Sequence, residues 1–291
     1  MSSFFTELAK KVAERWLSLL VLPGLLLVAA GWTSLLLGHG HALDVRALAL
    51  GFARSGAVIA RQPGATQALV VAGLLLASLA VGVVVQALTG PVRAAFVGHW
   101  PWVARRLASR LTRRRRARWQ AIVDRRAEAP PEDVDRLAVR ANKIAMAQPD
   151  RPTWIGDRAQ AVEQVAFNRY GLDLAFGWPR LWLVLPDTTR AEIEAAQGAF
   201  ASAVVTSAWA LPYLAVGAVW WPAALIALVI GVTGWSRARK AMATLADLTE
   251  ASLDLYGRTL AIALGVAAAD SIGPLAPEEG RRITGIVRKG R

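Results

Sequence analysis

Residues 68–89 form a continuous apolar segment without a single charged side chain. A helix rises about 1.5 Å per residue, so about 20 apolar residues cross the hydrocarbon core of a bilayer, which is roughly 30 Å thick. The segment is therefore long enough and apolar enough to span a membrane. It predicts a transmembrane helix, and this constrains the rest of the chain to the fold of a membrane protein.

A run of arginines without an acidic residue among them follows this segment: Arg105, Arg106, Arg110, Arg113, Arg114, Arg115, Arg116 and Arg118. Three interpretations are open. The run anchors the cytoplasmic end of the helix; it binds anionic lipid head groups, because Leu107, Leu111 and Trp119 fall near helical spacing; or it binds nucleic acid phosphates. The membrane already supplies a polyanion, so we predict anionic-lipid contact at these eight arginines and do not expect a nucleic acid partner.

The composition agrees with a membrane protein. Apolar residues make up 55% of the 291 residues and charged residues only 19%, whereas soluble chains have about half and a quarter. The net charge of +13 is concentrated in two regions: residues 91–199 have 19 basic against 12 acidic residues, and those after Trp235 have nine against six. Residues 38–67 have only three basic residues and one acidic. The positive-inside rule places both basic regions in the cytoplasm.

We therefore expect an all-α membrane protein with four transmembrane helices in two pairs and a mainly helical cytosolic domain. The expected order is an interfacial amphipathic helix (1–15), a transmembrane helix (16–37), an external loop (38–67), a second transmembrane helix (68–89), a basic cytosolic domain (91–199), a third and a fourth transmembrane helix (200–217 and 218–235) and a cytosolic helical tail (236–291). The protein is then expected to be a multi-pass protein of the cell membrane, with both termini in the cytoplasm.

Two of these spans have an alternative. The N-terminal region has a basic head, an apolar stretch and a small residue at Ala42, as a signal peptide does. Its apolar stretch exceeds the roughly 7–15 residues of a signal core, which favours a retained helix. The fourth span is only 14 residues long when counted from Pro222 to Trp235, so a re-entrant hairpin is the alternative to a full crossing from Ala218.

The external loop begins with Gly-His-Gly-His at positions 38–41. Two imidazoles so close in sequence can face one cation, but only Asp44 is near enough to act as a further ligand, and a zinc site needs three or four. We favour a solvated glycine-rich turn over a metal site. Residues 48–59 are apolar enough for a short helix on the outer surface.

The tail is expected to continue as a helix at 241–264 with a broad apolar face: Met242, Leu245, Leu248, Leu255, Tyr256, Leu260 and Leu264. Each of these side chains contributes about 1.5–3 kcal/mol when fully buried, and a soluble surface seldom exposes such a patch. Asp247, Glu250 and Asp254 oppose adsorption to an anionic leaflet. We therefore expect the tail to pack on residues 91–199, with Leu255 buried.

The most distinctive sequence lies at 152–186. It contains Pro-Thr-Trp-Ile-Gly-Asp (152–157), Arg-Tyr-Gly-Leu-Asp (169–173), Trp-Pro-Arg-Leu (178–181) and Leu-Pro (185–186). A helix is expected at 159–169 with Gly171 ending it, and 181–185 as a strand or a buried extended segment.

With these motifs, residues 152–265 resemble a group of bacterial four-helix membrane proteins of unassigned function. The resemblance implies a cytoplasmic segment with this pattern, followed by a membrane hairpin and a helix that carries Asp-Leu-Tyr (254–256), in a bacterial inner membrane. The chain departs from that group at Asp157, where the group has Asn, and at Gly257. The resemblance implies an architecture and no activity.

Residues suited to catalysis are scarce. The chain has three histidines and no cysteine, and lacks Gly-x-Ser-x-Gly, a phosphate-binding glycine-rich loop and His-Glu-x-x-His. Asp157, Glu163 and Asp173 are candidate carboxylates, but helix capping and ion pairing with Arg158 or Arg169 explain them more simply. We expect no catalytic residue, cofactor or metal. The favoured function is a non-catalytic membrane protein whose cytosolic domain binds an unknown cytosolic protein or a signal, as a scaffold, sensor or effector.

Three other functions stay open at this point. An oligomeric pore, which would be a homo-oligomer, is the main alternative, because apolar gates need no charge. A transporter usually has ionisable residues within its membrane helices, whereas Gln86 is the strongest polar group here. A membrane enzyme would lack every motif named above.

Overall fold

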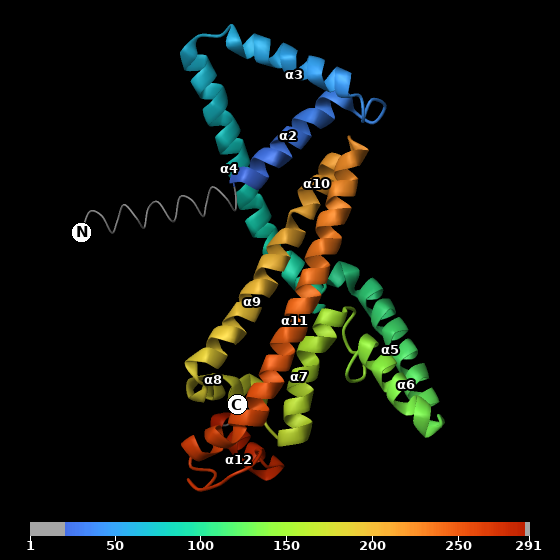
Figure 1. The fold of residues 1–291 in the computed structure, drawn as a ribbon, viewed down its shortest axis with the longest axis vertical. Coiled ribbons are helices and arrows are strands. Elements are labelled where there is room, and N and C mark those ends of the chain that lie inside the picture. The colour runs from blue at the N-terminus through green and yellow to red at the C-terminus, as the bar shows by residue number, and fades with distance from the viewer. Residues whose placement is uncertain (1–20, 289–291) are drawn as a thin grey trace, which may run out of the picture. The chain divides into compact units, whose positions relative to one another are not determined.

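The structure is a computed structural model and describes residues 21–288. Within that range the regular structure is helical throughout, which confirms the all-α class. The helices labelled in Figure 1 are α2 (Leu22–Leu37), α3 (Val45–Ala60), α4 (Gly64–Val97), α5 (Arg105–Ala127), α6 (Pro131–Ile144), α7 (Trp154–Tyr170), α8 (Leu174–Val184), α9 (Asp187–Ala208), α10 (Ala210–Gly217), α11 (Trp221–Ala263) and α12 (Pro277–Arg288). The expected interfacial helix at 1–15 and the start of the span 16–37 lie outside the described residues.

Three helical stretches are long and apolar enough to cross a membrane: Gly64–Ala127, Asp187–Gly217 and Trp221–Ala263. They contain the second and third spans expected from the sequence, and the fourth except for residues 218–220, which lie in the turn before α11. Helix α2 is apolar but has only 16 described residues. The lengths and compositions are thus consistent with a multi-pass membrane protein, and a fourth crossing by α2 stays a prediction.

The chain divides into two compact units. The apolar unit consists of residues 21–92 and 203–235, and the charged unit of residues 93–202 and 236–288. Helices α4, α9 and α11 each have residues in both. Each unit has its own buried core, so each can be described by itself.

Small residues let the helices of the apolar unit approach closely. A Cβ atom on Gly24 of α2 would lie 2.3 Å from the carbonyl oxygen of Ser78 on α4, so a side chain at position 24 does not fit. A Cβ atom on Gly234 of α11 would lie 2.1 Å from the Oγ of Ser207 on α9. Small residues at such contacts are typical of membrane helices, where close packing and not the hydrophobic effect holds helices together.

A proline interrupts the expected third span. Pro212 has no N–H to donate to the carbonyl of Ala208, four residues earlier, so the helical ladder breaks there. Helix α9 accordingly ends at Ala208, and α10 begins at Ala210. Trp209, between the two helices, is buried in the core of the apolar unit together with Val85 and Tyr213.

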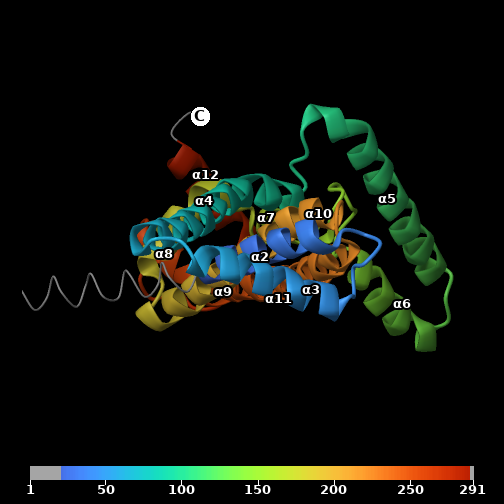
Figure 2. The same cartoon turned by 90° about the horizontal axis from the view of Figure 1, so that it is seen from above.

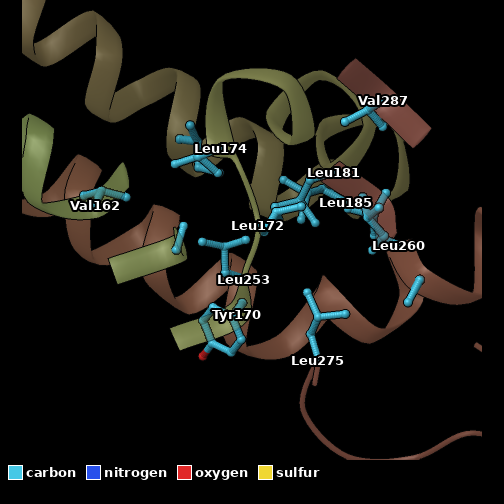
Figure 3. Packing of buried hydrophobic residues seen from close by; sticks show 14 of the residues in the cluster. Val162, Tyr170, Leu172, Leu174, Leu181, Leu185, Leu253, Leu260, Leu275 and Val287 are labelled. Carbon is cyan, nitrogen blue, oxygen red and sulfur yellow. The ribbon is translucent and has the colours of Figure 1, made fainter. Parts of the chain in front are cut away.

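The core of the charged unit joins segments that are far apart in the sequence (Figure 3). Leu172 and Leu181 come from the α7–α8 region and are fully buried. Leu253 and Leu260 of α11 are each 1% exposed, and Leu275 is 3% exposed. All five belong to one cluster. The tail after Trp235 therefore packs on residues from the 91–199 segment, and this is where its apolar face is buried.

The expectation of a strand or extended segment at 181–185 is wrong. These residues belong to α8 and its C-terminal cap. Leu174, Leu181 and Leu185 are spaced at seven and four residues, which places them on one helical face, and all three are buried in the core. The proline at 179 lies inside the helix without ending it. Core packing here outweighs the helix-breaking tendency of the prolines.

The expectation that Leu255 is buried is also wrong, because its side chain is 71% exposed. The buried stripe of α11 instead passes through Ala246, Leu253 and Leu260, seven residues apart. The acidic residues of the helix lie toward α7, where Asp254 meets Tyr170. These polar contacts fix the rotation of α11 about its axis and turn Leu255 to the surface.

A matched pair of substitutions tests this rotation. In the full-length protein, Leu253→Asp places an unpaired charge in the core and should lower the free energy of unfolding by about 4 kcal/mol or more. Leu255→Asp adds the same charge at an exposed position and should change it by about 0.5 kcal/mol or less. Thermal unfolding in detergent, combined with limited proteolysis at residues 148–152 between α6 and α7, measures both. Equal destabilisation by the two variants would show that α11 is rotated differently.

Candidate functional site

The distinctive motif at 169–173 forms the corner between α7 and α8. The hydroxyl of Tyr170 donates a hydrogen bond to the carboxylate of Asp254 on α11, and Arg169 lies 3.6 Å from the same carboxylate. Burial, and after it the hydrogen bond that the hydroxyl donates to Asp254, raises the pKa of Tyr170 to about 12. The phenol therefore stays protonated at neutral pH and acts as a donor that holds α7 against α11.

Helix α12 closes the same corner. Gly171 ends α7 in the left-handed conformation, with φ of 65°, which favours glycine. The Oγ of Thr284 donates to the carbonyl of Gly171 at 3.1 Å and accepts from the N–H of Asp173 at 2.9 Å. A Cβ atom on Gly280 would lie only 1.7 Å from the carbonyl oxygen of Tyr170. The contacts of Tyr170, Gly171 and Asp173 thus make this motif a structural joint between α7, α8, α11 and α12.

The preceding motif, at 152–157, fixes the start of α7. The side chain of Thr153 caps the helix by accepting from the N–H of Gly156 at 3.1 Å, and it donates to the carbonyl of Phe96 at 2.6 Å. A Cβ atom on Gly156 would lie 2.3 Å from the carbonyl oxygen of Val97. The threonine and the glycine therefore hold the end of α4 within the charged unit against the start of α7.

Asp157 is the best-connected carboxylate at this joint. One carboxylate oxygen accepts from the backbone N–H groups of Asp150 and Arg151, at 2.8 and 2.7 Å. The other accepts from the guanidinium of Arg115 at 2.6 Å, and Arg115 also donates to the carbonyl of Ile144 at 2.8 Å. The side chain of Asp157 is only 6% exposed. Its partner is thus Arg115 of α5, and the expected pairing with Arg158 does not form.

Arg158 faces the opposite way, toward α11. Its guanidinium pairs with Asp247 and lies 3.6 Å from Glu250. Burial raises the pKa of Glu250, and the charge of Arg158 opposes that rise. Together with Tyr170 and Asp254, these side chains form polar contacts along the α7–α11 packing. These contacts explain why acidic residues occur along the apolar face of α11.

The arginine run divides into two groups on α5, which packs side by side with α6 (Figure 2). Arg115 and Arg116 make internal ion pairs, with Asp157 and Asp150 respectively. The other six are exposed and make no ion pair with any residue of 21–288: Arg105, Arg106, Arg110, Arg113, Arg114 and Arg118. Exposed apolar side chains accompany them, namely Trp102, Val103 and Leu107. We call these nine residues the arginine surface.

A cleft of about 350 Å³ is the second candidate site. It lies within the charged unit and is lined mostly by apolar residues of α7, α8 and α11: Ala159, Val162, Leu174, Ala175, Trp178, Pro179, Met242, Leu245 and Ala246. Glu163, Gln197 and Thr249 supply its polar groups. Val162 and Leu174 are labelled in Figure 3, where they belong to the same buried cluster as the core. The cleft is therefore built on the rigid part of the unit.

The two loop histidines belong to the apolar unit and are part of neither candidate site. His39, His41 and Asp44 line a shallow depression together with Trp221. Asp44 caps α3 by accepting from the N–H of Ala47 at 2.9 Å. Among the described residues no group of three or more His, Cys, Asp or Glu is placed to hold a metal ion.

Glu163 is a candidate carboxylate from the sequence alone, but the cleft around it is not predictable in that way. The lining residues come from four helices, and Val162 and Met242 are 80 positions apart. No local spacing marks such a set, because only the packing of α7, α8, α9 and α11 brings it together. Asp157 and Asp173 were named with Glu163, and both turn out to be structural.

The chain was compared with protein families, with curated proteins and with solved structures. No family model, no curated protein and no solved structure matches the chain. The resemblance of residues 152–265 to bacterial four-helix membrane proteins therefore rests on their motifs alone.

Proposed function

We propose that this chain is a non-catalytic integral membrane protein whose cytosolic helical domain binds a partner or a signal. In this proposal the apolar unit is embedded in the cell membrane with four crossings, α2, α4, α9–α10 and the first part of α11. The charged unit is the cytosolic domain. Both termini are cytoplasmic, and α3 lies outside.

One observation carries the proposal: the boundaries between the packed units coincide with the boundaries of charge. Residues 64–92 and 203–235 of the apolar unit contain no charged side chain, and the charge resumes with Arg93 and Arg237. Among the described residues, every ion pair lies in the charged unit. A bilayer is the simplest reason for the boundaries of packing and of charge to agree, because charged side chains are costly in hydrocarbon.

The arginine surface fits contact with anionic lipid head groups. Its six unpaired arginines lie on a helix that begins eight residues after the end of α4. Each basic side chain near an anionic leaflet contributes about 1 kcal/mol, and Trp102, Val103 and Leu107 supply apolar groups for the interface. Arg115 and Arg116, which the sequence placed in the same site, are held instead by Asp157 and Asp150.

Cysteine labelling tests the threading, because the chain has no cysteine of its own. In intact cells an impermeant thiol reagent should label Gly56→Cys, on α3, and should leave Ala127→Cys, on α5, unlabelled until the membrane is opened. Both positions are exposed, and a Cβ atom on Gly56 meets nothing within 4 Å, so neither substitution disturbs packing. Labelling of Ala127→Cys but not of Gly56→Cys in intact cells would invert the topology and refute the proposal.

Hydrogen exchange in vesicles tests the lipid contact. Amides of α5 in the full-length protein should exchange more slowly in phosphatidylglycerol vesicles than in phosphatidylcholine vesicles, and about 1 M salt should remove the difference. The triple variant Arg113→Gln, Arg114→Gln and Arg118→Gln should lose the difference at low salt.

The control removes the same charge outside the arginine surface, with Arg125→Gln and Arg126→Gln in the last turn of α5 and Arg140→Gln on α6, which are also exposed. It should keep most of the protection by phosphatidylglycerol. Equal exchange of α5 in both lipids would argue against lipid contact, and tight binding of duplex DNA at physiological salt would favour the nucleic acid interpretation instead.

A further inference from the structure

The cleft in the charged unit has the size and lining of a ligand site. Its volume of about 350 Å³ falls within the range of roughly 300–1,000 Å³ that is usual for small-molecule pockets. Apolar side chains dominate its lining, and a few polar groups lie among them. In ligand pockets the apolar groups usually supply affinity and the polar groups fix the orientation of the ligand. Met242 and Ala246 of α11 are buried at its wall, so this wall is fixed by the core.

The charged side chains that line the cleft and the cleft beside it are both acidic. Glu163 is its one charged lining residue. A second cleft shares Glu163, Leu174 and Ala175 with it and adds Asp173, again without a basic residue. In a chain with a net charge of +13, two adjoining clefts that lack lysine and arginine are a clear local exception. A cation is favoured at this place and an anion is not.

The two carboxylates differ in availability. Asp173 is already used, because it caps α8 through the N–H of Ala175 at 3.1 Å and pairs with Arg288 at 2.5 Å. The side chain of Glu163 is exposed and makes no hydrogen bond or ion pair with any other residue of the described chain 21–288. Its carboxylate at the rim is thus free to pair with a charge brought by a ligand.

Trp178 adds a second group that favours a cation. It is half-buried in the wall of the cleft, and its ring centroid lies 6.0 Å from that of Trp182, which holds it in place. The face of an indole attracts organic cations, and ammonium groups with little hydration gain most from it. Leu245 and Pro179 beside it offer apolar contact to the remainder of such a ligand.

We propose that this cleft binds a small amphipathic organic cation, with one ammonium group and an apolar body about the size of an aromatic ring with short alkyl groups. The ammonium group pairs with Glu163 and lies near the face of Trp178, and the body packs on Val162, Met242 and Leu245. The inference deepens the proposed function, since it names the chemical class of the signal that the charged unit binds. A single free carboxylate does not hold a metal ion, which needs several ligands.

Calorimetry on the full-length protein in an uncharged, sugar-headed detergent tests the proposal. Benzyltriethylammonium is the probe, and N,N-diethylbenzamide and benzenesulfonate are its neutral and anionic counterparts. The cation should bind with a Kd of about 1 mM or tighter, and each counterpart should bind at least about tenfold more weakly. Glu163→Gln and Trp178→Leu should each weaken the cation about tenfold.

Glu194→Gln is the matched control, because Glu194 is an exposed carboxylate on α9 that does not line either cleft. It should bind the cation like the unmodified protein, and thermal unfolding should show that all variants are folded. Equal affinity for the three probes, an unchanged Kd in Glu163→Gln, or no binding of the cation would overturn the proposal. Because the assay is made in detergent, it is independent of threading, so it can fail while the labelling experiment succeeds, and the reverse.

Discussion

Charged groups are costly in hydrocarbon, and this constraint accounts for more of the chain than any other. Residues 64–92 and 203–235 contain no charge at all, so ion pairs cannot hold their helices together. Close approach does so instead, through Gly24 against Ser78 and Gly234 against Ser207. The charge that is excluded there is concentrated in the other unit, where ion pairs and hydrogen bonds connect helices that are far apart in sequence.

Within the charged unit, these polar contacts select one packing of the apolar surfaces. Arg158 and Tyr170 of α7 engage acidic residues on α11, while Asp157, on the same helix, engages Arg115 of α5. Breaking the mostly buried pair of Arg115 and Asp157 would cost about 3–5 kcal/mol, because it leaves an uncompensated charge. The contacts of Asp247 and Asp254 contribute less, because these carboxylates are 68% and 46% exposed. The sequence motifs at 152–157 and 169–173 thus build the domain, and candidate function moves to what they leave free: the arginine surface and the cleft at Glu163.

The sequence predicted helices well where apolar periodicity is long. The helices expected at 68–89, 159–169 and 241–264 correspond to parts of α4, α7 and α11. Leu255 shows that the same periodicity does not predict which side chains of a helix are buried. The apolar face of 241–264 is broad enough to include either Leu253 or Leu255, and the choice depends on where Asp254 meets Tyr170, which no local pattern reveals.

The same limit applies to the candidate site. Arg114 and Arg115 are neighbours in a uniform basic run, yet only Arg115 has a buried partner, 42 positions away in sequence. The prolines at 179 and 186 suggested an extended segment, whereas the core contacts of Leu181 and Leu185 favour a helix. In each case a contact between distant segments decides the outcome. Features set by composition, such as the uncharged stretches, are predictable because they do not depend on contacts between distant segments.

The central claim is that the apolar unit faces lipid and the charged unit faces water. Nitroxide labels on single cysteines in the vesicle-reconstituted protein test it most directly. Leu76 and Leu228 of the apolar unit and Phe167 of the charged unit are suitable positions, since each is more than half exposed. The account predicts that oxygen relaxes the labels at 76 and 228 and a water-soluble nickel chelate does not, with the opposite result at 167. Access of the nickel chelate to positions 76 and 228 would contradict it.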